Sequence, residues 1–154
     1  MIDRKTYPSQ EKKESTGFLL WQVTSIWQRN VAAVLRGHEL TQVQFALLAS
    51  LMWLEDKEEW VTQAMLARHA KLDEMMTSQV LRSLEGRGLV ERHPHPHDTR
   101  AKHLVLTAEG RAKAKNALPD VERVDLEYFS ILADSRPNFN QSLQDLIDKG
   151  GCHG

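Results

Sequence analysis

The chain has 154 residues, of which 41% are hydrophobic and 27% are charged, and its formal net charge is −1. These values are ordinary for a soluble globular protein with one domain. Membrane spans and signal peptides are excluded because no apolar run is long enough, and the polar N-terminal tail at 1–14 lacks an apolar core. The single cysteine, Cys152, excludes an internal disulfide framework. We therefore expect a cytoplasmic protein with no membrane partner.

The charges are unevenly distributed along the chain. Residues 61–115 contain ten Lys or Arg against six Asp or Glu, together with five of the seven histidines. The remainder contains ten against fifteen. A basic middle with acidic flanks indicates a polyanion-binding module inside a larger scaffold, although chance unevenness on solvated surfaces gives the same pattern.

The first predicted element is a long helix over residues 17–40. Its apolar positions cover more than one side, so we expect it to be buried on two sides, against its own core and against a second subunit. A capping box from Thr41 to Gln44 begins the next helix, which runs to about Leu54. The acidic stretch at 55–59 is interpreted as a solvated loop and not as a metal site.

Two short helices and a β-hairpin follow. Thr62 and Asp73 are typical N-terminal caps, and the turn between the two helices has the spacing of a helix-turn-helix. Residues 89–92 and 103–107 predict two antiparallel strands, so the unit as a whole is a winged helix. Thr107 caps a further helix, which we expect to be interrupted near Pro119, and a last helix follows it. The fold class is mainly α with a small β-hairpin wing.

The outward side of the second short helix suits DNA. On a helical wheel of residues 74–85, Met76, Val80 and Leu84 face inward. The opposite side carries a guanidinium, an amide, a hydroxyl and a thioether, which belong to Arg82, Gln79, Ser78 and Met75. Arginine pairs with guanine, glutamine with adenine, and an apolar group contacts the thymine methyl in the major groove. An ordinary amphipathic helix with a solvated outer side is the alternative.

Three segments carry a more specific signal, namely residues 61–92, Asp98-Thr99-Arg100-Ala101-Lys102, and LVLTAEG at 104–110. In this order and spacing they resemble the multiple-antibiotic-resistance regulator (MarR) family of winged-helix transcription factors. The resemblance implies a homodimer that binds double-stranded DNA at a pseudo-palindromic operator. It divides the chain into a polar tail (1–14), dimerisation helices (15–40 and 108–149), a DNA-binding winged helix-turn-helix (41–107) and a flexible tail (150–154).

Carried over by position, the resemblance also implies DNA contacts. Those in the major groove would come from Met75, Met76, Ser78, Gln79 and Arg82, although the wheel turns Met76 inward. Thr62 and Gln63 would reach phosphates at a helix N-terminus. In the wing, Asp98 looks like the residue that braces Arg100 for the minor groove, beside Lys102. The chain departs from the family pattern at two positions. Lys71 stands where the turn often has glycine, and Gln79 stands where arginine is frequent. Both departures are compatible with the fold, but the operator sequence cannot be predicted from them.

The loop RHPHPHDTR at 92–100 contains three candidate metal ligands, His93, His95 and His97, which share one side of an extended strand. The resemblance places them in the wing, which favours contact with a polyanion or with solvent, so no metal or other cofactor is expected. Some members of the family bind small aromatic ligands, and the candidate cleft residues here are Trp21, Trp27, His38, Met52 and Trp53. A Trp stripe at helical spacing is more often part of a core than of a ligand site.

No catalytic arrangement is present among the common motifs, since the chain lacks a Gly-x-Ser-x-Gly elbow, a phosphate-binding glycine loop and a His-Glu-x-x-His pair. We therefore expect no enzyme. The sequence predicts a sequence-specific DNA-binding transcriptional regulator, and specifically a repressor that a small aromatic ligand releases. The alternatives are a metal-responsive regulator, a redox-responsive regulator that uses Cys152, and a winged helix that binds proteins.

Overall fold

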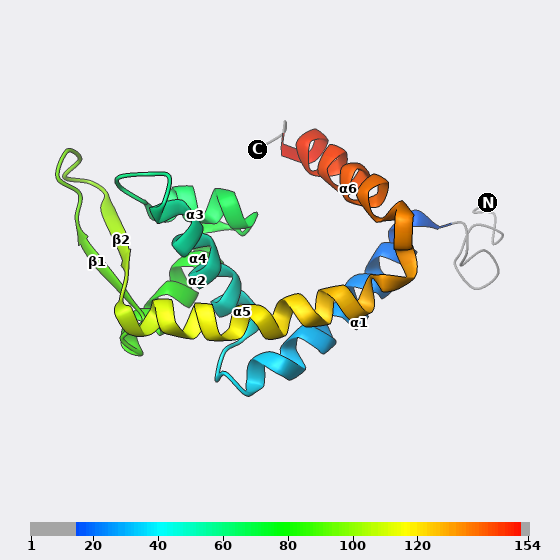
Figure 1. The fold of residues 1–154 in the computed structure, drawn as a ribbon. Helices are drawn as coiled ribbons and strands as arrows, with labels where there is room; N and C mark the ends of the chain where they lie inside the picture. Colours follow the sequence, from blue (N-terminus) through cyan, green and yellow to red (C-terminus); the bar gives the residue numbers. More distant parts are fainter. Residues whose placement is uncertain (1–14, 152–154) are drawn as a thin grey trace, which may run out of the picture. The chain divides into compact units, whose positions relative to one another are not determined.

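The computed structural model describes residues 15–151, so the predicted tail at 1–14 and Cys152 lie outside the described residues (Figure 1). The chain forms two compact units, and the boundary between them in the sequence follows Val121. The elements, in chain order, are α1 (Thr16–Arg36), α2 (Gln42–Glu55), α3 (Gln63–Ala70), α4 (Glu74–Gly86), β1 (Val90–Pro94), β2 (Lys102–Leu106), α5 (Ala108–Tyr128), the 3-10 helix η2 (Ser130–Ser135) and α6 (Arg136–Gly151). None of the helices in these residues could cross a lipid bilayer. The predicted fold class, mainly α with one β-hairpin, is confirmed.

Polar side chains cap the helices of the first unit as the sequence predicts. The side chain of Thr41 accepts a hydrogen bond from the backbone of Gln44, and the Gln44 side chain accepts one from Thr41, which completes the capping box. Thr62, Asp73 and Thr107 cap α3, α4 and α5 through side-chain oxygens. Each bond satisfies an N–H group that has no partner inside its helix.

The turn between α3 and α4 depends on Lys71, which adopts the left-handed conformation with φ 56° and ψ 39°. This conformation costs a residue with a Cβ about 1–2 kcal/mol, which explains why glycine suits the position. The N–H groups of Lys71 and Leu72 donate to the carbonyls of Arg68 and Ala67 at the end of α3. These two bonds close the turn without a glycine.

Two helix boundaries differ from the sequence prediction. Helix α1 ends at Arg36 and not at residue 40, because Glu39 takes a φ of 58° and the N–H of Leu40 turns back to the carbonyl of Leu35. The predicted interruption near Pro119 is wrong, since α5 continues through this residue to Tyr128. Pro119 is exposed. Because proline has no N–H, the carbonyl four residues earlier in the helix has no donor, and water can bond to it instead.

The inward side of α4 also differs from the helical wheel. Its buried residues are Thr77, Leu81 and Leu84, whereas 41% of Met76 is exposed and Val80 is only half-buried. Thr77 can be buried because its hydroxyl donates to the carbonyl of Asp73 at 2.9 Å. A wheel that ranks residues by apolar character misses this bond and therefore places the buried side one residue away.

The wing is an antiparallel hairpin in which Val90 pairs with Leu106 and His93 pairs with His103. Its two strands confirm the predicted hairpin, and β1 extends two residues further than expected, to Pro94. The N–H of Leu104 donates to the carbonyl of Val61 at 2.7 Å, just before α3. The wing is thereby attached to the helix-turn-helix by a backbone bond.

We predict that Gly110→Ala destabilises the protein by about 1–3 kcal/mol, as overpacking does. A Cβ on Gly110 would lie 2.0 Å from the carbonyl oxygen of Leu89, and backbone cannot move as a flexible side chain can. Urea unfolding at one fixed protein concentration measures the loss. Gly86→Ala is the control, because a Cβ there has no atom within 4 Å. Equal stability of the two variants would contradict the close approach of α5 to Leu89.

Candidate nucleic-acid interface

Helix α4 exposes the side that the sequence analysis assigned to DNA. Met75 is 75% exposed, and Gln79 and Arg82 are also exposed, while Ser78 is half-buried. The Arg82 guanidinium donates to the Ser78 hydroxyl at 3.2 Å, one turn earlier. Because a Met side chain gains nothing from water, its exposure beside these polar groups suits a surface that another molecule covers.

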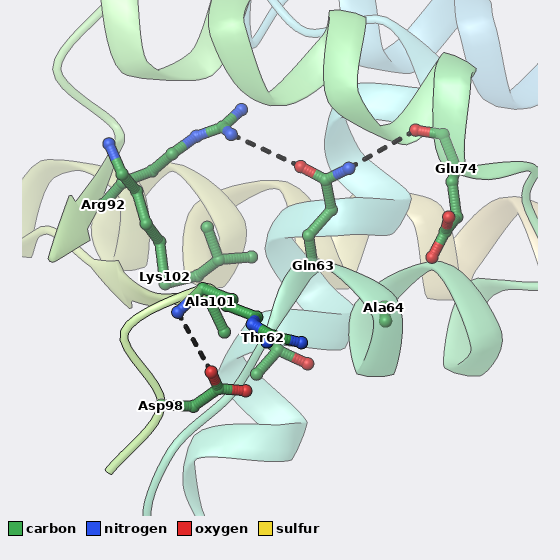
Figure 2. Close-up of a pocket in the computed structure, with 10 residues that line it drawn as sticks. Thr62, Gln63, Ala64, Glu74, Arg92, Asp98, Ala101 and Lys102 are labelled. Carbon is green, nitrogen blue, oxygen red and sulfur yellow. Dashed lines mark hydrogen bonds between the residues drawn. The ribbon is translucent and has the colours of Figure 1, made fainter. Parts of the chain in front are cut away.

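A concavity of about 580 Å³ lies beside this side of α4 (Figure 2). The start of α3, the start of α4 and the wing form its walls, and its lining residues are Thr62, Gln63, Ala64, Glu74, Arg92, Asp98, Arg100, Ala101, Lys102 and Leu104. Five of the predicted DNA-contact residues therefore come together here, namely Thr62, Gln63, Asp98, Arg100 and Lys102. The others lie on α4, where Glu74 of the lining directly precedes Met75.

Gln63 links three elements across the floor of this concavity. Its side-chain oxygen accepts a bond from the guanidinium of Arg92 at 3.3 Å, and its nitrogen makes a long bond of 3.5 Å to the carbonyl of Glu74 (Figure 2). Arg92 also pairs with the Glu85 carboxylate at 2.9 Å. The Gln63 side chain is thus occupied within the protein. Sequence reasoning missed Arg92 and Glu85, because no local pattern shows that β1 and α4 meet.

Asp98 braces Arg100 through the main chain. Its carboxylate oxygen accepts the backbone N–H of Arg100 at 3.0 Å, which is the local bond of an Asx turn. The sequence analysis left the form of this bracing open. In residues 15–151 no ion pair involves Arg100 or Lys102, and both are exposed. Two cations on the rim of the concavity are therefore available to an anion.

The three histidines of the loop have different partners. His93 lies 2.9 Å from the carboxylate of Glu91, whereas the His95 ring accepts backbone N–H groups from His97 and Asp98. Strand β1 ends at Pro94, so the alternation of an extended strand does not reach His97. Within the described part of the chain, no three His, Cys, Asp or Glu side chains are grouped so as to hold a metal ion.

The five candidate cleft residues have separate surroundings. Trp21 lines a cavity of about 230 Å³ on α1 with Gln22, Ser25, Ile26 and Arg29, and the other four candidates do not line it. His38 lies 2.6 Å from the carboxylate of Asp120. Trp53 stacks on His69 with ring centroids 4.8 Å apart. Trp27 and Met52 are half-buried. A shared aromatic cleft in this chain therefore stays a prediction.

Helix α1 is buried on one side only within the described chain. Val31 and Leu35 are buried in the first unit, while five large apolar side chains are exposed, namely Leu19, Leu20, Trp21, Val23 and Ile26. The second unit likewise exposes Leu126, Ile131, Leu146 and Ile147. Apolar groups at this density on exposed helices indicate surfaces that a partner covers.

The fold and the concavity define a winged helix-turn-helix protein. The profile of the MarR family matches residues 40–102, which include α2, α3, α4 and most of the wing. The chain is 44% identical to the HTH-type transcriptional regulator YdcH of Bacillus subtilis (strain 168), over 86% of this chain and 90% of the relative. The chain belongs to the MarR family.

Solved structures support the same fold. CouR from Rhodococcus jostii RHA1, bound to p-coumaroyl-CoA, is 27% identical with a TM-score of 0.76, over 90% of this chain and 95% of CouR. CouR bound to a 23-mer DNA duplex gives a TM-score of 0.77 at 26% identity, over 90% of this chain and 96% of that one. Rv2887 of Mycobacterium tuberculosis, in complex with salicylic acid, is 32% identical with a TM-score of 0.64, over 86% and 96% of the two chains.

We predict that Arg92→Ala lowers the free energy of unfolding by about 1–3 kcal/mol, because it leaves the carboxylate of Glu85 and the amide of Gln63 without their partner. Urea unfolding measures the effect. Glu91→Ala is the matched control, since it removes only the exposed pair with His93 and should change stability by less than about 1 kcal/mol. A stable Arg92→Ala variant would mean that Arg92 does not hold β1 against α3 and α4.

Proposed function

We propose that this chain is a homodimeric, sequence-specific DNA-binding transcriptional regulator that acts as a repressor. The observation that carries the proposal is the grouping of Arg100 and Lys102 with the N-terminus of α3 around one open concavity, beside the exposed side of α4. Cations and helix N-terminal N–H groups bind phosphate oxygens, whereas the polar groups of α4 suit base edges. In this proposal the protein acts by binding DNA and not by catalysis, and it is located in the cytoplasm.

In this proposal α4 enters the major groove and the wing reaches the adjacent minor groove. Met75, Ser78, Gln79 and Arg82 face base edges, and Thr62 caps the helix whose first N–H groups approach a phosphate. Arg100 enters the minor groove, where a narrow groove concentrates negative potential. Gln63 contributes by holding Arg92 in place, since its side chain is already bonded within the protein. The binding of CouR to a 23-mer DNA duplex supports DNA binding by this chain by analogy.

A second copy of the chain covers the exposed apolar side chains of α1 and of the second unit in this proposal. Two copies place two α4 helices and two wings on one duplex. The half-sites of a pseudo-palindromic operator then lie about one helical turn, roughly 10 bp, apart. The symmetry of the operator therefore follows from the symmetry of the homodimer.

The repressor is released by a small aromatic ligand. CouR with p-coumaroyl-CoA and Rv2887 with salicylic acid support this by analogy. The candidate ligand residues of this chain remain those of the sequence analysis, Trp21, Trp27, His38, Met52 and Trp53. No group of metal ligands in residues 15–151 supports control by a metal through the wing histidines, and Cys152 lies outside these residues.

The proposal is tested by fluorescence anisotropy with DNA from the upstream region of the gene itself, titrated at several salt concentrations. We expect tight binding that beats an unrelated duplex by about a thousandfold and falls steeply as salt rises. Selection from random DNA replaces the upstream fragment if that fragment is not the operator. If selection also enriches no sequence, the protein is not a specific DNA-binding regulator, and a winged helix that binds proteins takes its place.

We predict that Arg100→Ala weakens operator binding by about 1–3 kcal/mol and reduces the salt dependence. The variant loses a cation from the rim of the concavity, while Asp98 still accepts the backbone N–H of residue 100. Anisotropy at several salt concentrations gives both quantities. Lys57→Ala, which removes an exposed cation after the end of α2 and outside the lining of the concavity, is the control. Unchanged affinity of Arg100→Ala would remove the wing from the DNA interface.

We predict that Arg82→Ala changes sequence preference as well as affinity, because an arginine on the exposed side of α4 pairs with a guanine edge. Binding to operators with single base-pair changes shows which position loses discrimination, and the expected cost at that position is about 1–3 kcal/mol. A uniform loss over all sites would assign Arg82 to a phosphate and not to a base.

A further inference from the structure

The tip of the wing is organised around the ring of His95. Its Nδ1 atom accepts the backbone N–H groups of His97 and of Asp98, each at 3.1 Å. His95 is also half-buried, whereas its neighbours His93 and His97 are exposed. A single ring nitrogen therefore fixes the chain direction at the point where the hairpin reverses.

A series of bonds leads from this ring to Arg100. Asp98, whose N–H is held by the His95 ring, uses its carboxylate to accept the N–H of Arg100 at 3.0 Å. The Asp98 carbonyl accepts the N–H of Ala101 at 3.2 Å, and the Ala101 carbonyl accepts the N–H of His95 at 3.3 Å. The tip is thus a set of local bonds that includes the backbone of Arg100, and Arg100 is an exposed cation.

The His95 ring is itself held from the body of the winged helix. Its centroid lies 5.9 Å from that of Trp60, at an interplanar angle of 57°. Trp60 in turn contacts the ring of His103 edge-on at 4.8 Å. Trp60 comes two residues before the cap of α3. The contact between the His95 and Trp60 rings therefore holds the tip of the wing against the start of the helix-turn-helix.

We propose that His95 is a positioning residue for the DNA contact of the wing. The neutral imidazole, with its proton on Nε2, accepts the two N–H groups at Nδ1 and thereby sets Asp98 and Arg100 in place. Without an acceptor at this position the two N–H groups lose their partner, and the tip is no longer held in one conformation. This inference rests on the proposed DNA-binding function, since it specifies how that function presents its cation to the minor groove.

Two variants separate the acceptor from the ring. His95→Phe keeps a ring against Trp60 and has no acceptor, whereas His95→Asn loses the ring and keeps an oxygen that can accept backbone N–H groups, as in an Asx turn. His93→Phe is the matched control, because His93 accepts no backbone N–H in the described chain. His95→Leu repeats the measurement without an acceptor if the Phe variant unfolds at a lower temperature than the wild type.

Anisotropy with the selected operator gives the expected pattern. His95→Phe weakens binding at least about tenfold, like Arg100→Ala, while His95→Asn and His93→Phe stay within about threefold of the wild type. The double variant His95→Phe/Arg100→Ala binds no more weakly than Arg100→Ala alone, because both changes remove the same contact. Long-range ¹H–¹⁵N spectra of the free protein report the Nε2–H tautomer for His95.

Other outcomes overturn the inference. They are an unchanged affinity of His95→Phe, additive losses in the double variant, a loss in His95→Asn equal to that in His95→Phe, or an Nδ1–H tautomer. The proposed function fails separately, if the wild-type protein shows no specific, salt-dependent binding to any selected DNA. If Arg100→Ala weakens specific binding and His95→Phe does not, the role of His95 is contradicted but the proposed function is not.

Discussion

The backbone bond from the N–H of Leu104 to the carbonyl of Val61 is the constraint on which the winged helix depends. A two-stranded hairpin alone is marginally stable in water. The segment before α3 gives β2 a second backbone partner besides β1, through this bond and through the bridge between Thr62 and His103. Because Thr62 also caps α3, the same few residues fix the start of the helix-turn-helix and the position of the wing. The concavity exists because these two walls share one attachment.

A second attachment joins the base of the wing to the long helix α5. The carboxylate of Glu55, at the end of α2, accepts the N–H of Leu106 and pairs with the guanidinium of Arg111 in α5. A partly buried carboxylate with two partners is retained in one geometry, since the loss of either partner leaves a charge without compensation. The start of α5, the end of β2 and the end of α2 therefore move as one body within the first unit.

The sequence predicted what local chemistry determines. The caps at Thr41, Thr62 and Asp73 were correct, because each depends on residues only three positions apart. The prediction of DNA contacts depends on the resemblance to the MarR family, because periodicity alone leaves the exposed side of the second helix open to a solvated role. The bonds of Gln63 with Arg92 could not be predicted, because they join segments 29 residues apart in the sequence. Two predictions are wrong because of single hydrogen bonds. Thr77 is buried in place of Met76 because its hydroxyl bonds to the carbonyl of Asp73, and α5 continues through Pro119 although the helix loses one backbone bond there.

The exposure of Met75 has a consequence for sequence discrimination in the proposed DNA interface. Arginine and glutamine have fixed donor and acceptor geometry, so each demands one base edge. A thioether on three rotatable bonds adapts its shape to several apolar partners. An interface that combines the two kinds of group is strict at some base pairs and permissive at others. In the proposed repressor, tolerance of this sort gives related operators graded affinities, so that a rise in its concentration silences their promoters one after another and a fall releases them in the reverse order.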